Sequence, residues 1–261
     1  MIPKIIHYCW FGHNPLPRKA KKCMHSWAKK CPEYEIKEWN EENFDISQCP
    51  LYVRQAYEAK KWAFVSDYVR LKVVYDNGGI YLDTDVELLK PLDSLLIHKA
   101  YFGFDAGGAL INTGLGFGSE KGAAILQRML KDYDLIPFYK KDGGVDETCC
   151  PVRNTTALLE LGLKEDNSRQ VLAGDILILP SEYLDSIGYN NLTDCITKNS
   201  ISVHWYFASW LPEEYLKERA KKLKRFHWQQ KKENIRLLPN RICLNILGQQ
   251  RYEKWKAYIK R

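Results

Sequence analysis

Two aspartates, Asp83 and Asp85, are the residues of this sequence best suited to chemistry by type and spacing. They follow the short apolar segment Ile80-Tyr81-Leu82, which begins directly after Gly78-Gly79. In an extended chain residues i and i+2 point the same way, so both carboxylates project from one face, with Tyr81 further back on that face. Such oxygen pairs suit Mg²⁺ or Mn²⁺, which proteins hold by one or two carboxylates plus substrate phosphates. The pattern therefore predicts a divalent-metal site for a nucleoside diphosphate.

Three other interpretations of the acidic pair compete with a metal site. A solvated acidic turn is the commonest, but here the carboxylates end an apolar strand. A calcium-binding EF-hand loop needs Gly at its sixth position and Glu at its twelfth, where this chain has Leu88 and Ser94. The pair also resembles the phosphatase pattern D-x-D-x-[TV], which needs Thr or Val at position 87, where this chain has Glu87.

Other candidate residues lie far from the acidic pair in the sequence. Asp67 and Arg70 are three apart on an expected helix and therefore share a face. Their neighbours are mostly apolar, and a charged pair on a buried helix needs partners, so we favour a functional role over a surface ion pair. His204 and Trp10, each among aromatic residues, are by themselves more typical of a core.

Hydrophobic periodicity indicates the elements that position these residues. A continuous apolar run at 4–11 predicts a buried strand, spacing of i, i+3, i+4, i+7 at 20–28 predicts an amphipathic helix, and 34–39 resembles a second strand. Such a βαβ unit implies a parallel sheet with its ligand crevice at the carboxyl ends of the strands. We therefore expect an α/β fold. Its remaining elements are helices at 51–76 and 120–133 and strands at 80–82, 100–105, 109–117, 175–179 and 201–206.

Length and charge predict one domain with an appendage. The 261 residues are 45% hydrophobic and 27% charged, which excludes disordered and low-complexity classes. Residues 213–261 contain fifteen Lys and Arg against five Glu, so the extension carries +10 while the whole chain carries +7. We predict a domain over 1–212 and a basic, helical extension over 213–261 that meets an anionic membrane surface.

The cysteines and the hydropathy predict the compartment. The eight cysteines include no C-x-x-C pair, which argues against a zinc ribbon and a disulfide framework and favours a reducing compartment. No apolar run approaches the roughly 18–20 residues of a membrane span, and the first residues lack the pattern of a cleaved signal. We expect a cytoplasmic protein, peripheral at the inner face of the cell membrane.

Four motifs follow one another along the chain. They are Ile2-Pro3-Lys4-Ile5-Ile6-His7-Tyr8-Cys9-Trp10-Phe11-Gly12, Ser66-Asp67-Tyr68-Val69-Arg70, Tyr75-Asp76-Asn77-Gly78-Gly79-Ile80-Tyr81-Leu82-Asp83-Thr84-Asp85, and His204 with Ser209-Trp210. The set resembles glycosyltransferase family 32, which includes capsule and lipopolysaccharide sugar transferases and is distantly similar to the large clostridial glucosylating toxins. The resemblance spans about residues 1–212 and implies a GT-A type, Rossmann-like nucleotide-binding fold, a nucleotide-sugar donor, Mn²⁺ or Mg²⁺, and retention of anomeric configuration.

The resemblance also implies individual roles. It implies that the metal is held by Asp83 through water, by Asp85 directly and by His204, and that Asp83, Asp85 and Arg70 form the catalytic set. Many members have Thr-Gly-Pro where this chain has Cys149-Cys150-Pro151. The implied donor-binding residues are Trp10 on the base, Asp67, Arg70, Tyr81 and Asp83 on the ribose and sugar side, Asn112 beside the transferred sugar, and Ser209 and Trp210 on the diphosphate.

The implied function is transfer of a hexose by a metal-dependent, retaining glycosyltransferase. The donor is a nucleotide sugar, with UDP favoured over GDP, and the acceptor is a glycan or lipid-linked glycan of a surface polysaccharide. The alternative is a non-catalytic protein that binds nucleotide sugars or nucleic acid. A nucleic-acid partner is disfavoured because residues 1–212 carry a net charge of −3 and show no nucleic-acid motif.

Overall fold

The structure is a computed structural model that describes residues 1–189, 195–207 and 214–229. The chain divides into two units, residues 1–210 and 211–261, each described on its own below. The predicted boundary at residue 212 lies outside the described residues.

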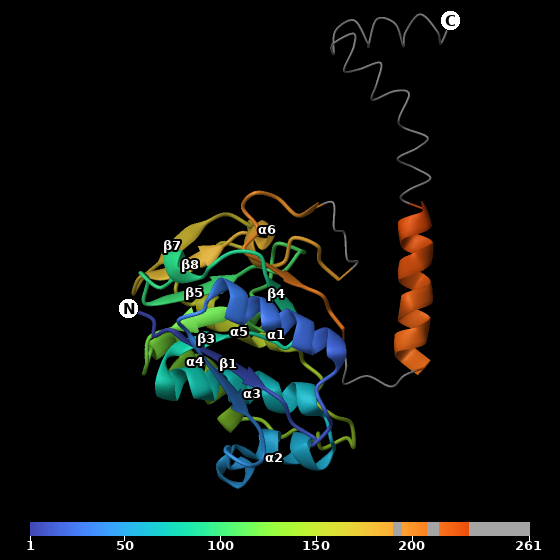
Figure 1. The fold of residues 1–261 in the computed structure, drawn as a ribbon. Coiled ribbons are helices and arrows are strands. Elements are labelled where there is room, and N and C mark those ends of the chain that lie inside the picture. Colours follow the sequence, from blue (N-terminus) through green and yellow to red (C-terminus); the bar gives the residue numbers. More distant parts are fainter. Residues whose placement is uncertain (190–194, 208–213, 230–261) are drawn as a thin grey trace, which may run out of the picture. The chain divides into compact units, whose positions relative to one another are not determined.

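Seven strands of the first unit form one mixed sheet in the order β2-β1-β3-β6-β5-β8-β7 (Figure 1). Strands β6 and β7 run antiparallel to the other five. The predicted α/β fold and the opening βαβ unit are confirmed, with helix α1 (Arg18–Lys30) between β1 and β2. The strands are β1 (Ile5–Cys9), β2 (Glu35–Trp39), β3 (Gly79–Tyr81), β5 (Ala100–Gly103), β6 (Phe117–Ser119), β7 (Gln170–Leu172) and β8 (Ile176–Leu179).

The sheet is mostly parallel, as expected, but β6 and β7 are antiparallel. The expected strand over 109–117 is wrong, because only Phe117 of that range lies in a strand. A parallel neighbour of β5 would need a crossover, usually a helix, of a dozen or more residues. Instead the chain turns back after β5 through a bridge between Phe104 and Ile111 and a short 3₁₀ helix, η3 (Thr113–Leu115). It therefore enters β6 from the edge at which β5 ends.

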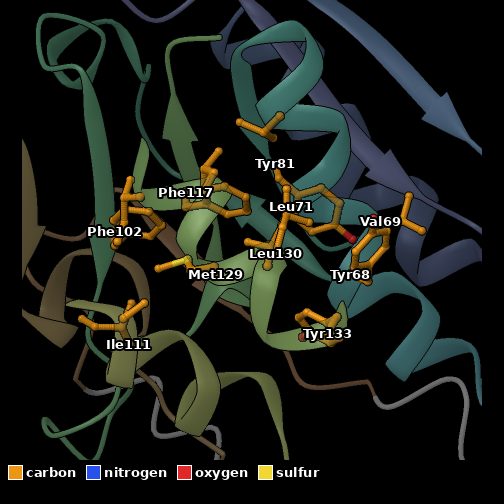
Figure 2. Close-up of a cluster of buried hydrophobic side chains, with 14 of the residues drawn as sticks. Tyr68, Val69, Leu71, Tyr81, Phe102, Ile111, Phe117, Met129, Leu130 and Tyr133 are labelled. Atoms are coloured by element: carbon orange, nitrogen blue, oxygen red, sulfur yellow. The ribbon is translucent and has the colours of Figure 1, made fainter. Parts of the chain in front are cut away.

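Both faces of the sheet are covered, which explains the continuous apolar runs in its strands. One face packs on helices α2 (Leu51–Glu58), α3 (Trp62–Asn77), α4 (Ala124–Asp134) and α5 (Cys150–Leu159). Figure 2 shows part of this core, where the ring of Phe117 stacks on that of Phe102 at 5.6 Å and lies 6.1 Å from that of Tyr81. The opposite face packs on α1, on the short helix α6 (Ser181–Leu184) and on a two-stranded sheet of β4 (Val86–Leu88) and β9 (Ser202–His204).

The expected helix over 51–76 is two helices. The break between α2 and α3 lies at Lys60, whose φ of 56° is left-handed. The amide of Lys60 donates to the Tyr57 carbonyl and that of Lys61 to the Ala56 carbonyl, so the end of α2 is capped through the backbone. Ala59, Lys60 and Lys61 are good helix formers, so propensity gives no sign of this break.

Residues 214–229 form a helix in the second unit, as predicted for that part of the extension. Among the described residues no helix is long and apolar enough to cross a bilayer. The seven described cysteines are free thiols.

Candidate functional site

The candidate site lies at one edge of the sheet, where β1, β3 and β5 end. Trp10 follows β1, and Asp83 and Asp85 follow β3. Because β6 runs antiparallel to these strands, the residues that precede it, Asn112 to Gly114, arrive at the same edge. The antiparallel strand that the sequence did not predict is therefore what brings Asn112 to the site.

Asp83, Asp85 and His204 form a three-residue donor cluster. One ligand atom from each lies within 4.8 Å of the others, and His204 Nε2 is 2.9 Å from Asp85 Oδ1. The pairing of β4 with β9 creates the cluster, because Val86 lies opposite His204 across the two strands. Two carboxylates and one imidazole form a donor set that suits Mn²⁺ or Mg²⁺. The residues present therefore fit the metal that the sequence predicts.

The backbone after β9 holds Asp85 in place. The amide of Phe207 donates to Asp85 Oδ2 over 2.8 Å, and the amide of Trp205 donates to the Asp85 carbonyl over 3.0 Å. Burial alone would raise the pKa of Asp85, but the attraction of His204, its hydrogen bond and that of the Phe207 amide hold this pKa below its ordinary value. Asp85 is therefore an anion at neutral pH, as a metal ligand must be.

Arg70 links the donor cluster to helix α3. Its Nη2 lies 3.1 Å from Asp67 Oδ1 and 3.2 Å from Asp83 Oδ1, and the Arg70 side chain is only 6% exposed. The guanidinium also lies over the Tyr81 ring at 5.1 Å, and the Tyr81 hydroxyl donates to Asp83 Oδ1 over 2.9 Å. Asp67 and Arg70 are thus a buried pair in contact with Asp83, and not the surface ion pair of the competing interpretation.

Asp83 differs from Asp85 in its electrostatics. Burial raises the pKa of Asp83, the nearby Arg70 lowers it, and the neighbouring Asp85 raises it further, so that the net shift is upward. A cation between the two carboxylates would remove this repulsion. The pair is therefore arranged to bind positive charge.

Asn112 and Asp83 both lie close to Gly114, while a place for Asn112 beside the transferred sugar stays a prediction. The Asn112 side chain caps η3 by accepting from the Gly114 amide over 2.8 Å. A Cβ on Gly114 would meet Asp83 Oδ2 at 2.6 Å, Asn112 Oδ1 at 3.1 Å and Arg70 Nη1 at 3.2 Å. Gly114 is thus a site residue that sequence reasoning missed, and Asn112-Thr113-Gly114 was the signal that could have found it.

Cys150 is a second residue that sequence reasoning missed. At the start of α5, its Sγ lies 3.6 Å from Arg70 Nη1 and 3.8 Å from Thr113 Oγ1. One turn further, Asn154 donates to Thr113 Oγ1 over 2.9 Å. The Cys149-Cys150-Pro151 segment, which departs from the family pattern, therefore joins α5 to Arg70 and to the η3 turn.

Asp185 and Tyr206 lie behind His204 and carry no signal in the sequence. The rings of Tyr206 and His204 are 4.0 Å apart, and Tyr206 has a left-handed φ of 51°. The Tyr206 hydroxyl donates to Asp185 Oδ2 over 2.6 Å, and the Ala106 amide donates to the same oxygen over 2.8 Å. These contacts fix the orientation of Tyr206 against the imidazole.

Three further residues, Trp10, Ser209 and Trp210, are predicted to bind the donor. Trp10 is partly buried, and its indole N–H donates to the Asn14 carbonyl over 2.5 Å. It lies at the carboxyl end of β1, as expected, while stacking on a base stays a prediction. Ser209 and Trp210 lie outside the described residues.

Comparisons with known proteins agree with this geometry. Residues 17–102 match the sequence profile of the glycosyltransferase sugar-binding region containing the DXD motif, a stretch that includes Asp67, Arg70, Asp83 and Asp85. This match confirms the glycosyltransferase expectation for that third of the chain. Assignment to family 32 in particular stays a prediction.

Two curated relatives and one solved structure illustrate the similarity. Inositol phosphoceramide mannosyltransferase 3 of Schizosaccharomyces pombe is 31% identical over 141 residues, which cover 52% of this chain and 38% of that protein. Subversion of eukaryotic traffic protein A of Legionella pneumophila is 30% identical over 129 residues, covering 40% of this chain and 20% of that protein. The PaToxG glycosyltransferase superposes with a TM-score of 0.47 at 22% identity, over 61% of this chain and 69% of that one. The chain thus spans less than half the length of the curated relatives that it matches.

Proposed function

We propose that this protein is a metal-dependent glycosyltransferase that moves a hexose from a nucleotide-sugar donor to a glycan or glycolipid acceptor. The observation that carries the proposal is the cluster of Asp83, Asp85 and His204 at the end of β3, within 4.8 Å of one another, where the DXD profile also matches. Carboxylates at the carboxyl ends of parallel strands are what a metal-bound nucleoside-diphosphate donor requires.

The acidic, basic and amide side chains of the site have different roles toward the donor. Asp83, Asp85 and His204 would hold Mn²⁺ or Mg²⁺, which when bound offsets the charge of the donor diphosphate as a Lewis acid. Arg70 supplies a fixed positive charge that stays in place because Asp67 and Asp83 hold it on two sides. Asn112, held by its hydrogen bond to Gly114, offers its amide beside Asp83 for a sugar hydroxyl.

We infer retention of configuration by a same-face displacement, in which the leaving phosphate accepts the acceptor's proton. Double displacement would need a carboxylate nucleophile near the sugar. Among the described residues, Asp67 and Asp83 bind Arg70, Asp85 pairs with His204, and Asp185 is buried. None of these carboxylates suits the role of nucleophile.

The identity of the donor sugar is proposed from the relatives. Three of the curated relatives are named as inositol phosphoceramide mannosyltransferases, so mannose is the first hexose to test. From the sequence we favoured UDP over GDP as the carrier and a surface polysaccharide as the product. We extend the acceptor class to phosphate-bearing lipids, because inositol phosphoceramide, which these relatives are named for, is one.

A thermal-shift screen tests the proposal. We expect UDP- or GDP-linked hexoses to raise the melting temperature when Mn²⁺ is present and not when EDTA is present. A ligand at 100 times its dissociation constant adds about 2.7 kcal/mol of stability. The donor that stabilises the protein should then be tested with its sugar radiolabelled. We expect the protein to release the labelled sugar slowly, because water takes the place of the acceptor. Stabilisation without any turnover would instead identify a binding protein.

A further inference from the structure

Helix α1 has an unusual charge distribution. Its 13 residues include Arg18, five lysines and His25 but no aspartate or glutamate, whereas residues 1–212 as a whole carry a net negative charge. The strongest concentration of positive charge in the first unit therefore lies on this one helix.

The positive charge is concentrated on the outer face of α1. The residues Ala20, Cys23 and Trp27 are buried against the sheet side. Opposite them, exposed basic residues recur at the i, i+4, i+7 and i+11 spacing of a single helix face. These residues, here called the α1 basic face, are Arg18, Lys21, Lys22, His25 and Lys29.

The first half of the α1 basic face, Arg18 with Lys21 and Lys22, is unfavourable for the helix itself, whereas Lys29 lies in the last turn, where a cation is favourable. Like charges three or four residues apart repel, and a cation in the first turn opposes the positive end of the helix dipole. The first turn of α1 contains no acidic residue, and its N-cap residue, Pro17, makes no side-chain cap hydrogen bond. Within the described part of the chain, no carboxylate forms an ion pair with Arg18, Lys21, Lys22 or Lys29. An anionic partner from outside would relieve this repulsion.

The same helix borders the candidate site. Trp27 Nε1 donates to the Val86 carbonyl over 2.7 Å, so α1 packs directly on the strand that follows Asp85. At its other end Lys19 Nζ lies 5.3 Å from the centre of the Phe207 ring, and the Phe207 amide donates to Asp85. The helix that carries the α1 basic face therefore contacts both segments that position Asp85.

We propose that the α1 basic face docks on an anionic lipid leaflet and so presents the site to a membrane-borne acceptor. The presentation of the site to an acceptor rests on the proposed function, whereas the docking of the helix does not. Lysine is a compact point charge on a flexible stem, which suits many mobile headgroups better than one fixed phosphate. The helix spans about 20 Å along the surface, enough to contact several headgroups at once. Duplex nucleic acid fits less well, because the acidic remainder of the unit would repel it.

Cosedimentation of the full chain with vesicles tests the docking. The probes are neutral phosphatidylcholine vesicles and vesicles with 30% phosphatidylserine, at low and at physiological salt. The test variant is Lys21→Gln/Lys22→Gln/Lys29→Gln. The matched control is Lys140→Gln/Lys141→Gln/Lys164→Gln, which removes the same charge from three exposed lysines outside α1. Each lysine near an anionic leaflet contributes appreciably to binding, so we expect the test variant to partition at least about tenfold more weakly and the control to change less than threefold.

Several outcomes would overturn the docking proposal. The first two are an equal loss of vesicle binding in the test and control variants, and a test variant that binds anionic vesicles like the wild type. The others are wild-type binding that is equal on neutral and anionic vesicles, and wild-type binding to duplex DNA but not to anionic vesicles. Donor binding in solution, measured by thermal shift on the same samples, separates this result from the proposed function. Both variants should bind donor like the wild type. If no variant binds donor, the proposed function fails while the vesicle result still stands.

Discussion

Gly114 packs so closely on Asp83 that the site has no room for a side chain at position 114. A methyl group there would lie 2.6 Å from Asp83 Oδ2, a distance that real Cβ atoms do not tolerate, so the carboxylate must move. We expect Gly114→Ala to lower kcat/KM for transfer by at least about tenfold, which corresponds to about 1.4 kcal/mol. Gly144→Ala is the control, because a methyl group at that position meets only the flexible Asp142 side chain. Equal activities of the two variants would show that Asp83 has no fixed role.

Trp10 tests the donor side of the site. An aromatic side chain at the carboxyl end of β1 faces the ligand edge of the sheet, and stacking on a base contributes about 1–3 kcal/mol. Trp10→Ala should therefore weaken nucleotide binding roughly ten- to a hundredfold, measured by calorimetry. Trp228→Ala, at an exposed position of the second unit, should leave the affinity unchanged. If a folded Trp10→Ala variant bound nucleotide with wild-type affinity, Trp10 would be a core residue that does not contact the donor.

His7 connects β1 to β2 and to the end of helix α3, and it makes the stability of the fold depend on pH. In β1, its Nδ1 accepts from the Trp39 indole over 3.0 Å, and its Nε2 donates to the Gly78 carbonyl over 2.8 Å. This arrangement requires a neutral ring, because a proton on Nδ1 would face the indole N–H. Burial accordingly lowers the pKa of His7.

The sign of the pH effect follows from that lowered pKa. The unfolded chain takes up the proton near pH 6.5 while the folded chain does not, so stability is complete above pH 6.5 and is lost as pH falls below it. We expect the free energy of unfolding to fall by up to about 1.4 kcal/mol per pH unit in this range. Urea titrations at pH 7.5, 6.5 and 5.5 measure it. His7→Gln should be less stable at pH 7.5 and should show a shallower slope; an unchanged slope would contradict the assignment.

Relations between residues close in the sequence could be predicted, whereas contacts that depend on distant elements could not. Period-two alternation was enough to place Tyr81, Asp83 and Asp85 on one face, because that relation is local. The contact of His204 with Asp85 depends on the pairing of β4 with β9, more than a hundred residues apart in the chain, and only the resemblance indicated it. The break at Lys60 and the antiparallel β6 depend on tertiary packing, for which the local sequence gave no sign.

At the scale of the whole molecule, the second unit carries its own prediction. Its described helix over 214–229 contains six lysines and arginines and two glutamates. We expect the full chain to sediment with anionic vesicles at low salt and to be released as salt is raised, because the Debye length shortens to about 8 Å at physiological ionic strength. Lys221→Gln/Lys222→Gln/Lys224→Gln should weaken this binding. Unchanged binding would show that the extension has another role, such as an interface between copies of the chain.

The central claim is that Asp83, Asp85 and His204 bind the divalent ion on which sugar transfer depends. Titration of Mn²⁺ into wild-type protein and Asp85→Asn, followed by the electron paramagnetic resonance of free Mn²⁺, tests it most directly. We expect one Mn²⁺ site per wild-type chain in the presence of nucleoside diphosphate. We also expect at least a hundredfold weaker binding and no transfer in Asp85→Asn, with the melting temperature preserved. Wild-type Mn²⁺ affinity in Asp85→Asn, or full transfer by the wild type in excess EDTA, would contradict the claim.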